Sequence, residues 1–267
     1  MSAVSTSGVL VMERGADGVI TLTLNRPDAH NALSPDLTAA LERAVDALRG
    51  DGVLRAVVLT GAGESFCAGG DIKSMREIVA GDRALRVQRS ARFAGMLAAI
   101  RALPVPVLAR VNGPAHGGGA GLVSVADIAI ASDTATFGFT EPKIGIAPAT
   151  ISPYVLGRIG AAGARRLFLT AQRFPAAEGL RLGLYDCVVP RSELDAKVKH
   201  ELDAILQCSP SALAACKRLI AEVPGLERGA AISHTAQVLA DLWETDDARE
   251  GIAAFAEKRK PRWSRGH

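Results

Sequence analysis

Apolar runs alternate with amphipathic segments through the first half of the chain. Residues Val19–Leu24 alternate threonine with aliphatic side chains, which predicts a strand. Residues Ala56–Thr60 are continuously apolar, as in a strand buried on both faces of a parallel sheet. Between them, leucine and valine recur at helical spacing from Ser34–Pro35, a good helix start, to Arg49–Gly50. Strands separated by helices indicate an α/β core with right-handed crossovers.

The pattern changes from mixed strands and helices to mostly helices after the middle of the chain. Before that point, the sequence predicts a long helix over Asp82–Ala102 and strands over Val105–Val111 and Asp127–Ala131. From Pro148 onward helical patterns dominate. The helices expected there are Ala161–Leu169, Pro175–Gly183, Arg191–Leu206, Ser209–Glu222 and Thr245–Arg259, with only Asp186–Pro190 extended. The sequence therefore predicts an α/β core over residues 1–190 and a helical C-terminal region over residues 191–267. No linker rich in proline, glycine or serine separates them, so the C-terminal region is not expected to be an independent domain.

Composition narrows the class of protein. The chain has 267 residues, of which 48% are hydrophobic and 22% charged, as expected of a globular protein with a core. A net charge of +3 is too small to indicate a nucleic-acid partner, and the basic run Lys258–Arg265 is expected to be a solvated tail. No apolar run approaches the roughly 18 residues of a membrane span, and residues 1–8 lack the features of a signal peptide. Scattered cysteines and histidines predict neither disulfides nor a metal site, and favour a cytoplasmic location.

Two glycine-rich loops follow two of the predicted buried strands. One is Cys67–Asp71, and the other is Gly117–Gly119, which leads into a small-residue segment that is expected to begin a helix. In a parallel sheet both loops lie at the carboxyl ends of strands, where ligands bind. Unpaired N–H groups from two such loops can converge on one oxygen that acquires negative charge, as in an oxyanion hole. The alternative is a pair of unrelated tight turns.

The sequence gives less support to nucleotide binding, serine hydrolysis or cysteine nucleophilic catalysis. The glycine loops match neither a dinucleotide-binding nor a P-loop motif, and no G-x-S-x-G marks a serine hydrolase. Cys67 and His116 are a conceivable nucleophile–base pair, but Cys67 is better interpreted as a small packed side chain. Glu141 lies in an otherwise apolar loop shaped by proline and glycine. If buried beside the two glycine loops it would be a strong general acid or base, and the alternative is an exposed loop glutamate.

Five motifs stand in order and at appropriate spacing along the chain. They are Asn25–Pro27 with Asn31–Leu33, Ser65–Lys73, Asn112–Gly119, Asp127–Ser132 and Glu250–Trp263. Together they resemble the crotonase superfamily, the enoyl-CoA hydratase/isomerase family, over about residues 9–263. The resemblance implies an α/β crotonase-like spiral of ββα units, followed by a helical C-terminal trimerisation region, as a homotrimer or a dimer of trimers. It also implies an acyl-CoA substrate and no separate cofactor, because coenzyme A is part of that substrate.

The resemblance also assigns site residues by position. It makes the N–H groups of Gly70 and Gly118 the oxyanion donors and Glu141 the catalytic carboxylate. Phe255 and Lys258 match positions that reach the CoA of a neighbouring subunit. The remaining residues that it places along the CoA path are Arg26, Ala68, Asp71, Ile72 and Lys73.

One position departs from the commonest family pattern. Family hydratases commonly carry two glutamates, and Gly121 stands at the position of the first. Residues Ala147–Val155 are similar to a branch of methylglutaconyl-CoA and isohexenylglutaconyl-CoA hydratases in which a glycine also stands there. This resemblance implies that Glu141 both activates water and donates the proton, and that the space over Gly121 holds a branched or carboxylated acyl group. The first expectation is thus an enoyl-CoA hydratase that adds water across the α,β double bond through an oxyanion-stabilised enolate. The alternatives are an enoyl-CoA isomerase, which needs one glutamate, or another enolate-based acyl-CoA enzyme, and a non-catalytic CoA-thioester binder.

Overall fold

The computed structural model describes residues 2–264, which divide into two compact units. The core unit comprises Met1–Leu103 and Val107–Val198, and the C-terminal unit comprises Pro104–Pro106 and Lys199–His267. The boundary expected from the sequence, after residue 190, precedes helix α7 (Leu194–Leu206), whereas the compact units divide within that helix.

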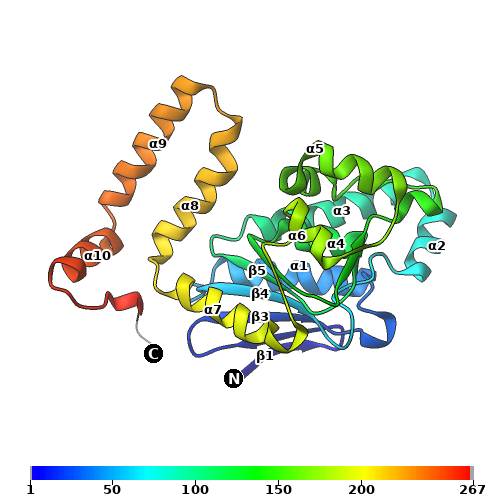
Figure 1. Cartoon of the computed structure of the whole chain (residues 1–267), viewed down its shortest axis with the longest axis horizontal. Coiled ribbons are helices and arrows are strands. Elements are labelled where there is room, and N and C mark those ends of the chain that lie inside the picture. The colour runs from blue at the N-terminus through cyan, green and yellow to red at the C-terminus, as the bar shows by residue number, and fades with distance from the viewer. Residues whose placement is uncertain (1, 265–267) are drawn as a thin grey trace. The chain divides into compact units, whose positions relative to one another are not determined.

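A seven-stranded sheet forms the centre of the core unit (Figure 1). Its order is β1-β2-β3-β4-β5-β7-β10, antiparallel from β1 to β3 and parallel from β3 onward. The strands are β1 (Ser2–Ser7), β2 (Leu10–Arg14), β3 (Val19–Leu24), β4 (Ala56–Gly61), β5 (Val107–Val111), β7 (Ile128–Ser132) and β10 (Cys187–Val189). Every residue of β4 is buried, as its continuous apolar run predicts.

A second, three-stranded sheet consists of very short strands. It contains β6 (Ala115–His116), β8 (Thr136–Gly138) and β9 (Phe174–Pro175) in the order β6-β8-β9. Strand β5 of the main sheet is followed by β6 and then by helix α4 (Gly118–Val125), and β7 is followed by β8 and then by α5 (Ser152–Thr170). The chain thus repeats a ββα unit, the α/β crotonase architecture that the resemblance implies.

Helices cover the main sheet, and in Figure 1 α3, α4 and α5 are drawn above its labelled strands. The helices not yet bounded in the core unit are α1 (Pro35–Arg49), α2 (Ile72–Ala80), α3 (Arg83–Arg101), α6 (Ala176–Leu182) and the 3-10 turns Pro27–Ala29, Glu141–Ile144 and Arg191–Glu193. Helix α1 begins where the sequence predicts, because the Ser34 side chain accepts a hydrogen bond from the N–H of Leu37. Its buried face includes Leu37, Leu41, Val45 and Leu48, the residues that recur at helical spacing in the sequence.

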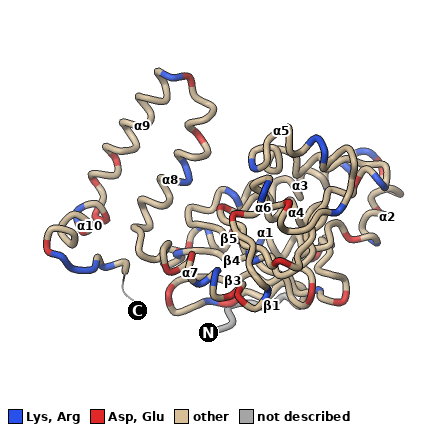
Figure 2. The backbone as a smooth tube through the Cα atoms, viewed as in Figure 1, with Lys and Arg blue, Asp and Glu red and all other residues tan. Residues whose placement is uncertain are grey.

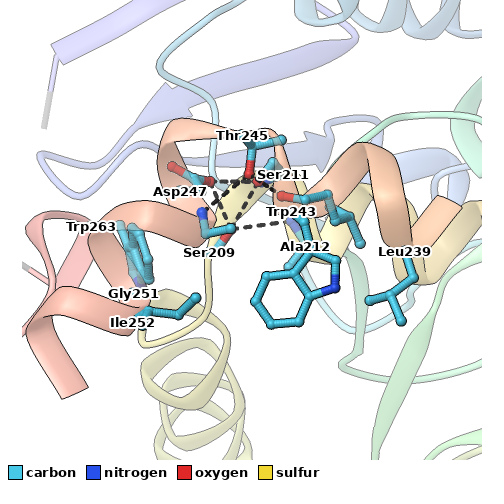
Figure 3. A pocket seen from close by; sticks show the side chains of 12 residues that line it. Ser209, Ser211, Ala212, Leu239, Trp243, Thr245, Asp247, Gly251, Ile252 and Trp263 are labelled. Carbon is cyan, nitrogen blue, oxygen red and sulfur yellow. Dashed lines mark hydrogen bonds between the residues drawn. The ribbon is translucent and has the colours of Figure 1, made fainter. Parts of the chain in front are cut away.

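The C-terminal unit contains helices α8 (Pro210–Glu222), α9 (Arg228–Trp243) and α10 (Asp246–Ala256), with 3-10 turns at Val223–Gly225 and Arg262–Ser264. A pocket of about 300 Å³ lies among these elements, lined by apolar side chains that include Leu239, Trp243 and Ile252 (Figure 3). None of the helices within residues 2–264 combines the length and apolar character that crossing a membrane requires.

The basic segment after α10, the blue stretch near the end of the chain in Figure 2, is exposed at Lys258–Lys260 and Arg262, as the sequence predicts, and Arg265 lies outside the described residues. Arg259 and Arg262 both contact Glu250, whose pKa the Arg259 guanidinium lowers to about 2. The indole N–H of Trp263 donates to Gln207 O at 3.0 Å. The segment is thus solvated but not a free tail, because an acidic partner and an aromatic side chain hold it against the helices of this unit.

Candidate active site

Three short segments lie side by side and position the candidate residues; two are strands of the second sheet, and the third is joined to it by an isolated bridge. Cys67 forms a parallel bridge with Ala115, and Ala115 pairs in parallel with Phe137 of β8. Because parallel segments run in the same direction, the residues that follow each of them emerge at one edge. Those residues are Gly70, Gly118 and Glu141.

The N–H of Gly70 is turned outward by the pairing of its neighbours. The N–H of Leu33 donates to Gly69 O at 2.7 Å, and the N–H of Asp71 donates to Leu33 O at 3.4 Å. These two bonds flank Gly70 in a parallel bridge, in which the central residue directs its own N–H away from the partner strand. Gly70 as a residue is exposed, so a ligand can reach it.

Gly118 is the first residue of α4. The preceding Gly117 has φ +51°, a conformation that favours glycine, and its N–H donates to Gly138 O at 2.8 Å. The first bond of the helix runs from the N–H of Gly121 to Gly117 O at 3.0 Å, which leaves the N–H of Gly118 without an intrahelical partner. A Cβ atom built on Gly69 would lie 3.6 Å from Gly118 N, so the two glycine segments are in direct contact.

The carboxyl group of Glu141 lies over the same turn. A Cβ atom built on Gly117 would lie 2.9 Å from Glu141 Oε1. Among the described residues, the buried Glu141 Oε2 has no hydrogen-bond partner. Burial raises the pKa of the Glu141 carboxyl above its ordinary value. The side chain is thus not the exposed loop glutamate of the alternative interpretation, and its environment suits a group that gains and loses a proton.

Ile151 fills the space over Gly121. A Cβ atom built on Gly121 would lie 2.3 Å from Ile151 Cγ2, and Ile151 itself is buried. The expectation that this space holds an acyl group is therefore wrong. Gly117 and Gly121 are four residues apart on one helical face, so the Glu141 carboxyl and the apolar Ile151 side chain cover successive turns of that face.

Apolar side chains that sequence patterns did not single out surround the two amides. A Cβ atom on Gly70 would lie 2.3 Å from Met75 Cε, and one on Gly118 would lie 2.7 Å from Leu33 Cδ1 and 3.2 Å from Phe93 Cζ. Met75, Leu33 and Phe93 come from separate elements, and helical spacing alone carries no signal that they meet here. Their presence makes the surroundings of the amides apolar, where a hydrogen bond to a developing charge is strong.

The residues expected to contact CoA fall into three groups. Ala68, Ile72 and Lys73 are exposed beside Gly70, as a ligand-lining segment requires. Phe255 and Lys258 belong to the C-terminal unit, where both are exposed. The last group, Arg26 and Asp71, forms a mutual ion pair at 3.0 Å.

Cys67 and His116 are both buried, and neither is ready for nucleophilic chemistry. Burial raises the pKa of the Cys67 thiol to about 12, so the thiolate is scarce at neutral pH. Burial and the positive charge of Arg173 lower the pKa of His116 to about 4. Within the described part of the chain, no cluster of three His, Cys, Asp or Glu side chains is placed to hold a metal ion.

Comparison with known proteins agrees with this fold. A family model for enoyl-CoA hydratase/isomerase matches residues 14–266. A putative enoyl-CoA hydratase of Thermus thermophilus is 34% identical, with 92% of this chain and 97% of the relative covered. Enoyl-CoA hydratase EchA19 of Mycobacterium tuberculosis is 35% identical, with 98% of each covered. The solved structure of Pseudomonas aeruginosa AtuE is 39% identical at a TM-score of 0.93, with 96% of this chain and 100% of that chain covered.

The fold and the matched sequence place the protein among the crotonases, α/β proteins with C-terminal helices. Within that superfamily the chain belongs to the enoyl-CoA hydratase/isomerase family, which acts on acyl-CoA substrates.

Proposed function

We propose that this protein is an enoyl-CoA hydratase that uses Glu141 as its single catalytic carboxylate. The observation that supports this proposal best is the buried, unpartnered Glu141 Oε2 beside the first turn of α4. The ionised carboxylate takes a proton from water while the water oxygen forms a bond to Cβ of the α,β-unsaturated thioester. The electron pair of the double bond moves through Cα to the carbonyl oxygen, and the carboxylic acid then returns a proton to Cα.

The N–H groups of Gly70 and Gly118 stabilise the enolate oxygen in this proposal. Their contribution is greatest when the charge is on that oxygen, so they bind the transition state more tightly than the substrate. Each such donor typically contributes about a hundredfold to a thousandfold in rate. Ala68, Ile72 and Lys73 would lie along the CoA, and Phe255 and Lys258 would reach the CoA of a neighbouring copy in a trimer or a dimer of trimers.

One observation favours a second candidate, an enoyl-CoA isomerase. Ile151 packs against Gly121, so the family position of a second glutamate is closed by an apolar side chain. An isomerase needs only one carboxylate, because the proton removed from one carbon returns to another. Absorbance measurements distinguish the two reactions. Hydration removes the absorbance of the conjugated enoyl thioester, whereas isomerisation of a β,γ-enoyl-CoA creates it.

Replacing Glu141 with glutamine tests the role of the carboxylate. Glu141→Gln keeps the shape of the side chain but removes the base, so kcat on crotonyl-CoA or a branched glutaconyl-type thioester should fall by about 10²- to 10⁴-fold. Affinity for a saturated acyl-CoA, measured by calorimetry, should change little. Glu64→Gln is the matched control, because Glu64 is exposed and pairs with Arg191. A Glu141→Gln enzyme with unchanged turnover would exclude the proposed mechanism.

A further inference from the structure

A short ladder holds the segment that carries Gly70. The N–H of Ala68 donates to His30 O at 2.9 Å, and the N–H of Leu33 donates to Gly69 O at 2.7 Å. On the far side of Gly70, the N–H of Asp71 reaches Leu33 O only at 3.4 Å. The backbone therefore fixes the peptide unit that carries Gly69 O and the N–H of Gly70 firmly, and holds the next unit, which carries the N–H of Asp71, only weakly.

The Arg26 guanidinium spans both strands of this ladder beside its weak end. Nη1 donates to Ala32 O at 2.5 Å on one strand and to Asp71 Oδ2 at 3.0 Å on the other. Nη2 donates to the same Asp71 oxygen at 3.0 Å. The two side chains are 23% and 14% exposed, so the pair is largely shielded from water.

Asp71 connects this pair to helix α2. Its Oδ1 accepts from the N–H of Ser74 at 3.0 Å and caps the helix, while its Oδ2 receives Arg26. The N–H of Ser74 contributes most to lowering the pKa of Asp71 below its ordinary value, and Arg26 adds to the effect. Asp71 is thus held as an anion by contacts on both of its oxygens.

Asn31 holds the backbone of Arg26 in place. Its side chain is fully buried, with Oδ1 accepting from the N–H of Arg26 at 2.8 Å. Its Nδ2 donates to Ala62 O and Ser65 O, in the loop between β4 and Gly70, at 2.9 and 2.8 Å. Asn31 has φ +56°, an uncommon conformation that these three hydrogen bonds stabilise.

We propose that Arg26 is a positioning residue that aims the N–H of Gly70 through its bonds to Ala32 and Asp71, and that it is not a contact for CoA. This inference rests on the proposed function, in which the N–H of Gly70 binds the thioester oxygen. Since a displacement of about 1 Å in an active site lowers a rate by up to about 100-fold, loosening the weakly held chain at Asp71, directly after Gly70, affects turnover more than affinity.

Arg26→Lys tests the inference by keeping the positive charge and removing the planar fork that bridges the two strands. We expect kcat on an enoyl-CoA to fall by about 10- to 100-fold while KM changes by less than about threefold. Asp71→Asn is the second variant, because asparagine still caps a helix but offers no charge to Arg26. The opposite result, a KM that rises with kcat unchanged, would make Arg26 a substrate contact and overturn the inference.

Arg86→Ala is the matched control. The Arg86 side chain binds Ile78 O, Val79 O and Gly81 O at the other end of α2. Removing it deletes three side-chain-to-backbone bonds at the C-terminal end of the same helix, but leaves the ladder beside Gly70 intact. We expect kcat and KM of this variant to stay within about threefold of the wild type. A loss of kcat as large as that of Arg26→Lys would show that general loosening of α2, and not the aim of Gly70, is responsible.

An infrared measurement separates failure of this inference from failure of the proposed function. Butyryl-CoA labelled with ¹³C at the thioester carbonyl is saturated, so it binds without being hydrated. In the wild type, hydrogen bonds to its oxygen should lower the carbonyl stretching frequency, and in Arg26→Lys much of that shift should be lost. A shift that persists in Arg26→Lys would contradict the positioning role alone. No shift in the wild type would refute the oxyanion hole itself, and the inference with it.

Discussion

His116 is a buried histidine in the turn that leads to Gly118. Its Nε2 lies 3.4 Å from Thr136 Oγ1, and its Nδ1 is buried without a partner among the described residues. The nearby positive charge of Arg173 adds to the effect of burial, and the two lower the pKa of the imidazole from 6.5 to about 4. The fold therefore holds His116 in its neutral form at physiological pH.

This lowered pKa predicts a loss of stability in mild acid. Between pH 6.5 and about pH 4, His116 is protonated in the unfolded chain but remains neutral in the folded chain. The free energy of unfolding therefore falls as the pH drops from 6.5 toward 4. The full loss is about 3 kcal/mol, since each pKa unit corresponds to about 1.36 kcal/mol. Urea unfolding of the wild type and of His116→Gln at several pH values measures it.

The difference in the free energy of unfolding between the wild type and His116→Gln separates the effect of His116 from that of other titrating groups. Glu141 acts in the opposite direction, because its raised pKa favours the folded state when it is protonated. Its effect is present in both proteins and cancels in the comparison. If the gap between the wild type and His116→Gln stays constant from pH 7 to pH 4.5, His116 is not held neutral by the fold.

At the scale of elements, the contact between α4 and the start of α5 predicts that glycine is required at position 121. A methyl group at that position would overlap the buried, β-branched Ile151, whose side chain has little rotamer freedom. Gly121→Ala should therefore lower the free energy of unfolding by about 1–3 kcal/mol. Urea denaturation checks this value. When Ile151→Ala is already present, adding Gly121→Ala should lower the free energy of unfolding much less than it does in the wild type.

Gly95→Ala provides the control for the intrinsic effect of alanine in a helix. Gly95 lies within α3 and is exposed, and apart from its chain neighbours and the helix's own backbone, a Cβ atom there would meet no atom within 4 Å. Alanine at this position should stabilise the protein by about 0.5–1 kcal/mol. Destabilisation by Gly95→Ala as large as that by Gly121→Ala would show that the Ile151 contact is not the cause.

Most of the elements that sequence patterns predicted are long enough to show a period, although the three-residue β10 was predicted and the sixteen-residue α9 was not. Strand β4 and helix α1 lie where the apolar run and the helical spacing indicated. Strands β6, β8 and β9 have two or three residues each, too few for any alternation to be visible, although they set the register of the candidate site. Helix α9 was also missed; several of its apolar side chains, such as Ile232 and Leu239, are exposed.

The candidate residues were predictable as residue types, but their surroundings were not. The glycine loops indicated paired amides, yet which N–H is free depends on bonds between Leu33 and the segment around Gly70, which are far apart in sequence. Likewise, an apolar loop composition left the burial of Glu141 open, because burial depends on how β8 lies against the turn before α4. The pairing of Arg26 with Asp71 carries no local signal, since 45 residues separate them.

At the scale of the whole molecule, the C-terminal unit leaves large apolar side chains in contact with solvent. They lie on α8, α9 and α10 and include Ile220, Ile232, Leu239, Trp243, Ile252 and Phe255, the last of which is 88% exposed. Monomeric proteins rarely expose so many neighbouring apolar residues, which usually mark a contact with another chain. We expect copies of this chain to cover the surface, as in the trimer that the family resemblance implies.

Light scattering on the purified protein tests this expectation. The mass should be about three or six times that of the 27.8 kDa chain. Ile232→Glu together with Leu239→Glu puts two charges on exposed positions of α9, and burying them between copies is unfavourable, so the mass should fall toward that of one chain. Val53→Glu is the control, because Val53 is 68% exposed, much as Ile232 is at 65%, but lies in the core unit. A wild type that scatters as a monomer at micromolar concentration would contradict the expectation, and the exposed apolar surface would then require a different partner.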